Sequence, residues 1–151
     1  MPITGGPYLA AAFLCEKALR EVDGVNSYIR VVDRWTVTGP TDNMPQTPIA
    51  ATLVVAFKSG IHRGSGQLVI TPTSPSDARM PSITIPVHFE GDEDRGVVIV
   101  APMQFGVQEP GLYWFNVSLD GQSLSEIPIR VVYHRVAQSQ TPPTGYPPAQ
   151  R

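Results

Sequence analysis

The sequence has a single cysteine, Cys15, among its 151 residues. One cysteine can form no disulfide within the chain and cannot build a cysteine-based zinc site. The histidines do not show the spacing of metal ligands; they stand at His62, His88 and His134. We therefore expect no metal and no other cofactor, and we expect Cys15 to be a buried structural thiol.

Charge is also scarce, since charged residues make up 16% of the chain and the net charge is −2. A nucleic-acid-binding protein needs a clustered basic face, which a chain with a pI near 5.8 does not suggest. The apolar run over residues 8–15 is too short to cross a bilayer and lacks the basic flank of a secretory signal. We expect a soluble, cytoplasmic protein that binds neither nucleic acid nor membrane.

The motifs of common enzymes are missing as well. No glycine-rich phosphate loop precedes a helix, and no nucleophile elbow is present. No nucleophile and base, and no set of metal ligands, can be paired from the sequence. These absences predict a protein that is not an enzyme.

Proline and glycine are abundant, with 16 and 13 copies. They separate short runs rich in Val, Ile, Thr and aromatic residues, a pattern typical of all-β domains. The runs predict strands at about 9–17, 26–38, 49–57, 66–72, 82–90, 96–105, 112–119 and 124–135. Their number and spacing favour an immunoglobulin-like β-sandwich of seven or eight mainly antiparallel strands.

This β-sandwich domain is expected to span residues 8–136. Residues 1–7 contain two prolines and two glycines, and we expect a flexible N-terminus there. Residues 137–151 are polar and proline-rich, which predicts a disordered tail. Tyr146 lies between proline pairs, so the tail is either a ligand for a partner domain or simply solvated.

Two of the predicted strands carry open questions. Residues 10–20 are good helix formers, so a short helix competes with a strand there. In the second segment, alternation places Asp33 on the face expected to meet the core, together with Ile29, Val31, Trp35 and Val37. A buried carboxylate needs a partner, so Asp33 either pairs with an arginine, caps a loop amide or acts as a catalytic group.

The segment from Glu109 to Phe115 resembles the tyrosine corner of immunoglobulin-like sandwiches. Glu109, Gly111 and Tyr113 match its alternation, and Phe115 stands where those folds carry a core cysteine. In that motif the tyrosine hydroxyl bonds to the main chain a few residues upstream. The resemblance implies a fold class and no activity.

The following residues predict a hairpin with a register fault. A two-residue turn at Asp120-Gly121 pairs Val117 with Leu124. Continuing that register would turn a run of apolar residues to solvent, namely Ile127, Ile129, Val131 and Tyr133. We therefore predict a β-bulge at Ser125-Glu126, after which the run faces the core. Pro128 cannot donate to a ladder, so its strand should lie at a sheet edge or its missing N–H should face outward.

A broader resemblance covers most of the chain. Residues 13–34, residues 54–60 and the C-terminal hairpin look like an uncharacterised bacterial all-β domain family of unknown function. That family is a small β-sandwich with no assigned activity, cofactor or substrate. The resemblance implies a fold and supplies no site residues.

Two loops and one aromatic residue are candidates for interaction. Loop 58–66 offers glycine amides with His62 and Arg63 to an anion, and loop 90–96 offers Asp92 and Asp94 among four carboxylates to calcium. Trp114 should face outward, where it would mark a contact or pack under a loop. We expect a non-catalytic binding or scaffolding module for a protein partner; the alternative is a sensor of an anion or calcium at these loops.

Overall fold

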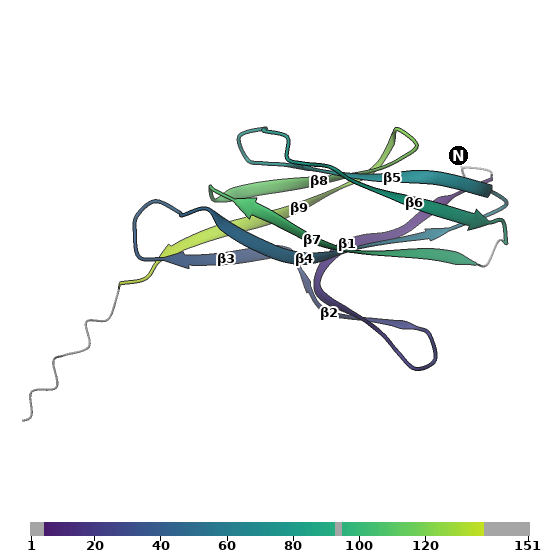
Figure 1. The fold of residues 1–151 in the computed structure, drawn as a ribbon, viewed down its shortest axis with the longest axis horizontal. Coiled ribbons are helices and arrows are strands. Elements are labelled where there is room, and N and C mark those ends of the chain that lie inside the picture. The colour runs from purple at the N-terminus through teal and green to yellow at the C-terminus, as the bar shows by residue number, and fades with distance from the viewer. Residues whose placement is uncertain (1–4, 93–94, 138–151) are drawn as a thin grey trace, which may run out of the picture.

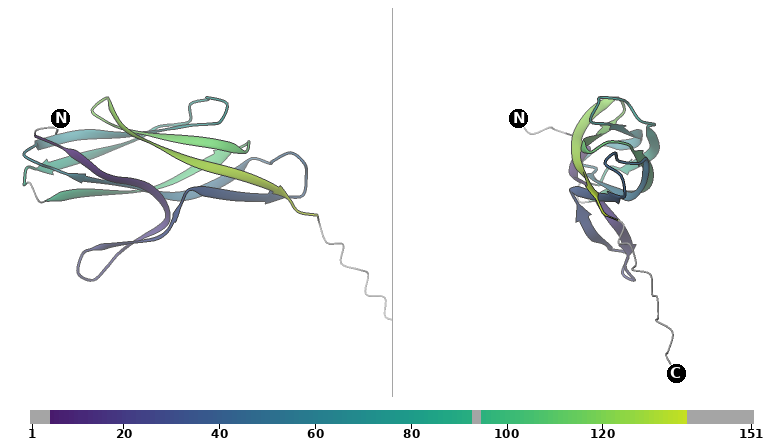
Figure 2. Two further views of the ribbon diagram at one scale, coloured as in Figure 1. Left: turned by 180° about the vertical axis from the view of Figure 1, so that it is seen from behind. Right: turned by 90° about the vertical axis from the view of Figure 1, so that its left-hand side faces the viewer.

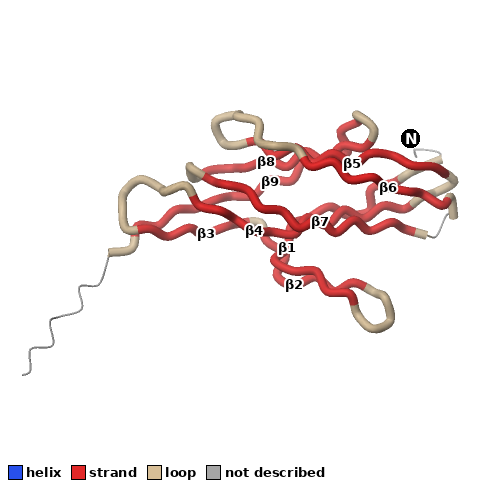
Figure 3. Tube along the Cα trace, in the orientation of Figure 1, coloured by secondary structure: helices blue, strands red, loops and turns tan. Residues whose placement is uncertain are grey.

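The computed structural model describes residues 5–92 and 95–137, and the described residues form strands, turns and loops without a helix (Figure 3). No helix long and apolar enough to cross a membrane therefore occurs in that part of the chain. The described residues form nine strands: β1 (Tyr8–Arg20), β2 (Asn26–Val32), β3 (Arg34–Gly39), β4 (Thr47–Lys58), β5 (Arg63–Thr73), β6 (Ile83–Glu90), β7 (Gly96–Val107), β8 (Gly111–Leu119) and β9 (Gln122–Arg135).

The strands form two sheets that pack face to face as an immunoglobulin-like sandwich (Figure 1). Sheet A has the order β2-β1-β4-β7, and sheet B has the order β3-β9-β8-β5-β6. All neighbouring strands are antiparallel except β3 and β9, which run parallel. The predicted all-β sandwich is confirmed, with nine strands in place of seven or eight. The disordered tail predicted for 137–151 falls almost entirely outside the described residues.

The core lies between the sheets and is built from alternate residues of each strand, as the two-residue period requires. Its largest fully buried side chains include Phe57 of sheet A and Phe89 of sheet B, whose rings meet edge to face at 5.6 Å. Phe105 and Phe115 make a similar contact across the sheets at 5.2 Å. These contacts fix which face of each sheet points inward.

The first segment is a strand, in spite of its helix-forming residues. Residues 8–15 pair with β4 and residues 14–20 pair with β2, so tertiary pairing overrides local propensity. Leu14 is fully buried on the core side.

The predicted strand over 26–38 is two strands that belong to different sheets. β2 pairs with β1 in sheet A, and β3 pairs with β9 in sheet B, with only Asp33 between them. The expectation that Ile29 and Val31 face the core is wrong, because they are 41% and 62% exposed. Asp33 is exposed too, and its main-chain oxygen accepts a hydrogen bond from the Arg130 N–H at 3.0 Å. Its side chain therefore needs no buried partner.

The β8–β9 hairpin follows the prediction closely. Asp120 and Gly121 both have positive φ, at 48° and 83°, as a type I′ turn requires. The register shift comes one residue earlier than expected: Ser118 pairs with Ser123 and Val117 with Ser125, so Leu124 is the extra residue. Beyond it the apolar run turns inward as predicted, with Ile129 and Val131 buried and Ile127 and Tyr133 packed against the core.

The predicted tyrosine corner is also present. The Tyr113 hydroxyl donates to the main-chain oxygen of Glu109 at 2.9 Å. The carboxylate of Glu109 accepts from the N–H and the hydroxyl of Ser76 at 3.1 and 2.7 Å, which ties the 74–81 loop to the corner.

Pro128 lies in an interior strand, so the expectation of an edge strand is wrong for β9 as a whole. Pairing with β3 begins only at Arg130, however. At Pro128 the strand therefore has β8 as its single neighbour, and the missing N–H faces a locally open edge.

Candidate interaction surface

One hairpin projects from the body of the sandwich. After Cys15, β1 leaves β4 and continues with β2 alone as its partner. Residues 16–30, which we call the arm, extend away from the body in each view (Figures 1 and 2). Because the arm packs on the body only at its base, both of its faces meet solvent.

The arm carries apolar side chains in exposed positions. Val22 at its tip is fully exposed, Val25 is 61% exposed and Ile29 is 41% exposed. At its base the rings of Phe13 and Tyr28 meet edge to face at 5.0 Å. The arm also holds an internal ion pair between Arg30 and Glu16 at 3.1 Å. Val22 and Val25 near the tip therefore expose most of their surface to solvent within the described part of the chain.

The outward face of sheet A beside the arm is apolar as well. Residues that stand opposite each other on neighbouring strands share a face. Three rows of such residues cross β1, β4 and β7 on this face: Ala11-Ala56-Val98, Phe13-Val54-Val100 and Cys15-Thr52-Pro102. We call this face the outer patch; it consists of Ala11, Phe13, Cys15, Val31, Thr52, Val54, Ala56, Val98, Val100 and Pro102. None of these residues is charged. Antiparallel sheets with one solvated face usually alternate apolar and polar residues, and this sheet does not.

Burial varies across the outer patch. Two residues of the outer patch, Val54 and Cys15, have no exposed surface. Val54 lies between Phe13 and Val100, and Cys15 lies between Val31 and Thr52. The flanking Val98, Val100 and Val31 are 41%, 39% and 62% exposed. Burial raises the pKa of the Cys15 thiol, and a main-chain hydrogen bond from Lys17 opposes the shift. The thiol is therefore protonated and shielded rather than reactive.

Sequence reasoning missed the outer patch, although a signal for it exists. Residues 49–57 and 97–103 are nearly continuous apolar runs. Such runs indicate strands covered on both faces, whereas the sandwich covers only one.

The predicted loops come together at one end of the sandwich. Arg63 of β5 stands opposite Glu90 of β6 in the strand register. The Ser59 N–H donates a hydrogen bond to the Arg95 main-chain oxygen at 3.1 Å. A depression of about 300 Å³ lies there, lined by residues that include Ser59, Glu90 and Arg95.

Three charged groups at this end form ion pairs with each other. Arg95 binds the carboxylates of Glu90 at 2.9 Å and Asp92 at 3.5 Å. The Arg63 side chain lies against Gly91, and the His62 ring contacts Phe89 at 5.4 Å. Asp94 lies outside the described residues. Within the described part of the chain, no group of three His, Cys, Asp or Glu is placed to hold a metal ion.

The remaining candidates lie on sheet B. Trp114 faces outward and is 40% exposed, between Thr73 and Pro128, so it is separated from the outer patch by the whole sandwich. Ser65 and His88 form a side-chain hydrogen bond of 3.2 Å on exposed positions of β5 and β6. No carboxylate among the described residues hydrogen-bonds to this imidazole.

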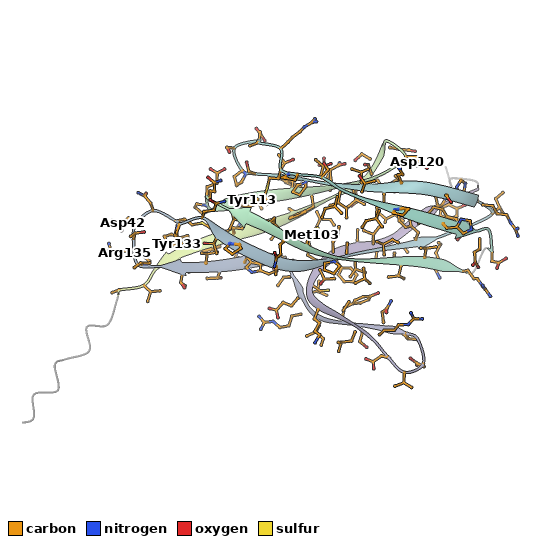
Figure 4. The ribbon with its side chains drawn as sticks, in the orientation of Figure 1. Asp42, Met103, Tyr113, Asp120, Tyr133 and Arg135 are labelled. Atoms are coloured by element: carbon orange, nitrogen blue, oxygen red, sulfur yellow. The ribbon has the colours of Figure 1, made fainter. Side chains whose placement is uncertain are left out.

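A groove opens at the other end of the molecule. It has a volume of about 590 Å³ and is lined by loop residues that include Gln46, Arg79 and Gln108. Figure 4 places Tyr113 near this end, and Tyr133, Arg135 and Asp42 lie together beyond it. Arg135 binds Asp42 at 2.7 Å, and the Tyr133 hydroxyl donates to the Thr41 main-chain oxygen at 2.6 Å. These contacts fasten the loop between β3 and β4 to the end of β9.

Residues 10–132 match a family described as a family of unknown function (DUF6941). The chain belongs to this family. The match spans the arm, both sheets and most of β9, so the outer patch lies within the DUF6941 domain. No curated protein matches the chain. Among solved structures, the CARDB domain of a Pyrococcus furiosus protein, in complex with di-metal ions, is similar, with a TM-score of 0.43 and 12% identity over 87% of this chain and 95% of that one.

Proposed function

We propose that this DUF6941 protein is a non-catalytic binding module that holds a protein partner on the outer patch and the arm. The observation that carries the proposal is the outer patch itself, ten uncharged residues on the outward face of a sheet. Isolated exposed apolar residues are ordinary, but contiguous apolar faces mark interaction sites. The arm adds exposed valines and an isoleucine beside that face.

A protein fits this surface better than a small molecule. Small ligands bind in concave pockets with a few convergent polar groups. The outer patch is a sheet face without charged groups, and hydrophobic burial against another protein is the interaction that such a face offers.

Site-specific photo-crosslinking in cells tests the proposal. A benzophenone amino acid replaces Val100 on the outer patch or Ile29 on the arm, and both positions are exposed enough to accept it. Thr84, exposed on the outward face of β6, is the matched control, and Trp114 tests sheet B. We expect crosslinks to polypeptide from Val100 and Ile29 and none from Thr84. Crosslinks from Trp114 alone would move the interaction to sheet B and contradict the proposal.

The converging loops support a second candidate, a sensor of a small anion. The observation in its favour is that loops 58–66 and 90–96, separate in sequence, meet around one depression lined by Ser59 and Arg95, while the Arg63 side chain lies against Gly91 of the second loop. Calorimetry with inorganic phosphate and with calcium tests it. A heat of binding with phosphate that disappears in the Arg63→Gln variant supports an anion site. Heat with calcium alone would assign the acidic loop instead, and no heat with either would remove the candidate.

A further inference from the structure

We infer that the partner held by the outer patch and the arm is a second copy of this chain. The inference rests on the proposed function and names its partner. It is carried by the arrangement of one projecting apolar hairpin and one apolar face on the same molecule, and by the charges along the arm.

The shape is self-complementary. The arm projects from the body beside the outer patch, with Val22, Val25 and Ile29 exposed (Figure 2). A two-fold axis makes the same surface of both copies meet, so each arm can cover the outer patch of the other copy. Each copy then supplies both the projecting residues and the face that receives them.

The charges permit two arms to meet. The arm contains three acidic residues, Glu16, Glu21 and Asp23, and three basic residues, Lys17, Arg20 and Arg30, so its formal charge is zero. Arg30 and Glu16 already pair within the arm. Among the described residues, Lys17 and Arg20 have no ion-pair partner in their own chain. The acidic residues Glu21 and Asp23 lie at the tip.

These positions are complementary in an antiparallel packing of two arms. The acidic tip of one arm, with Glu21 and Asp23, then lies beside the base of the other arm, where Lys17 stands. Opposite charges at the rim of an apolar contact set its orientation more than its affinity. The arm thus supplies both the apolar contact and the means to align it.

The edges of sheet A favour packing of faces over extension of the sheet. Arg30 in the edge strand β2 has a φ of 53°, and Pro102 lies in the other edge strand, β7. A left-handed residue and a proline both disrupt the ladder that an incoming strand would need. Extension of sheet A past β2 at Arg30 or past β7 at Pro102 is therefore disfavoured, and contact between the side chains of the outer patch and the arm does not require such extension.

Sedimentation velocity of the purified full chain tests the inference across two orders of magnitude in concentration. We expect a species of twice 16.4 kDa that dissociates on dilution. Val25→Glu on the arm and Val100→Glu on the outer patch should each weaken the dimer about tenfold or more, because each buries a carboxylate in an apolar contact. Ile61→Glu is the matched control, since Ile61 is 67% exposed in the β4–β5 loop.

Charge reversal tests the orientation. Lys17→Glu and Glu21→Lys should each weaken association, and the double variant should recover part of the loss. Both residues are exposed, so each variant should fold, which circular dichroism checks.

The outcomes separate the two proposals. A chain that stays monomeric while Val100 crosslinks to a different protein overturns the inference and leaves the proposed function standing. A monomer without crosslinks from either position overturns both. A dimer weakened by Ile61→Glu and not by Val25→Glu would place the contact elsewhere and also overturn the inference.

Discussion

Single side chains fasten the loops of this sandwich to its strands. Tyr113 and Tyr133 each donate a hydroxyl hydrogen bond to a main-chain oxygen, at Glu109 and at Thr41. Only the first was predictable, because its partner lies four residues away and belongs to a known local pattern. The partner of Tyr133 lies 92 residues away in the sequence, so no local sequence pattern predicts this hydrogen bond.

Removing one corner hydroxyl tests this role. Tyr113→Phe should lower the free energy of unfolding by about 1–2 kcal/mol, since the ring still fills the core but the Glu109 carbonyl loses its donor. Tyr133→Phe should cost less, because its bond is exposed to water. Tyr28→Phe is the control, as its hydroxyl forms no hydrogen bond among the described residues. Urea denaturation measures all three, and equal losses for Tyr113→Phe and Tyr28→Phe would refute the assignment.

The buried thiol should make stability depend on alkaline pH. The pKa of Cys15 is raised in the folded state, so the folded chain keeps its proton when the unfolded chain has lost it. Below the unfolded pKa, about 8.5, the contribution of Cys15 is constant. Above it the free energy of unfolding falls as pH rises toward the folded pKa.

Urea denaturation at about pH 7 and pH 9.5 checks this dependence. Cys15→Ala removes the titrating group and should lose less stability between the two pH values than the wild-type chain loses. The comparison cancels every pH effect that the two chains share. Identical pH dependence of the two chains would show that the thiol does not ionise in this range.

At the scale of elements, hairpins could be predicted and sheet membership could not. The turn at Asp120-Gly121 and the register fault before Ile127 follow from neighbours in sequence. The exact bulge residue, Leu124, depends on packing against the core and was misplaced by one position. The change of sheet at Asp33 leaves no local mark, because the alternation of 26–38 continues through it.

Asp120 links the β8–β9 turn to β5, and its removal should loosen both. Its carboxylate accepts from the Gln67 N–H at 2.8 Å, and its N–H donates to the Gln67 oxygen at 3.0 Å. Asp120→Ala loses the acceptor and places alanine at a φ of 48°, so we expect a loss of about 1–2 kcal/mol. Asp120→Asn keeps an acceptor oxygen and tolerates positive φ, so it should lose less.

Thermal unfolding of both variants, with hydrogen exchange at the Gln67 amide, measures this effect. Faster exchange at Gln67 in Asp120→Ala than in Asp120→Asn is the expected signature. Equal exchange in the two variants would show that the carboxylate does not hold β5.

At the scale of the whole molecule, the sandwich is predicted from the sequence and the outer patch is not. The candidate residues in loops 58–66 and 90–96 are distinguished by their charge, and the structure pairs one of them, Asp92, together with Glu90, to Arg95. The outer patch is made of ordinary valines and alanines, which become a surface only when three strands align. One sequence signal points to it. A strand with one face in solvent should carry polar residues on that face, and these strands carry apolar residues there.

A dimer that buries the outer patch should also unfold in a concentration-dependent way. Unfolding of a dimer to two chains becomes harder as total concentration rises, by about 1.4 kcal/mol of dimer for each tenfold increase. For two chains of this length, Tm should rise by about 2 °C per tenfold increase. Scanning calorimetry over two decades of concentration measures it, and Val25→Glu should reduce the dependence while Ile61→Glu keeps it. A wild-type Tm that does not move with concentration would mean that native association contributes nothing to stability, and the outer patch would then be free in the folded protein.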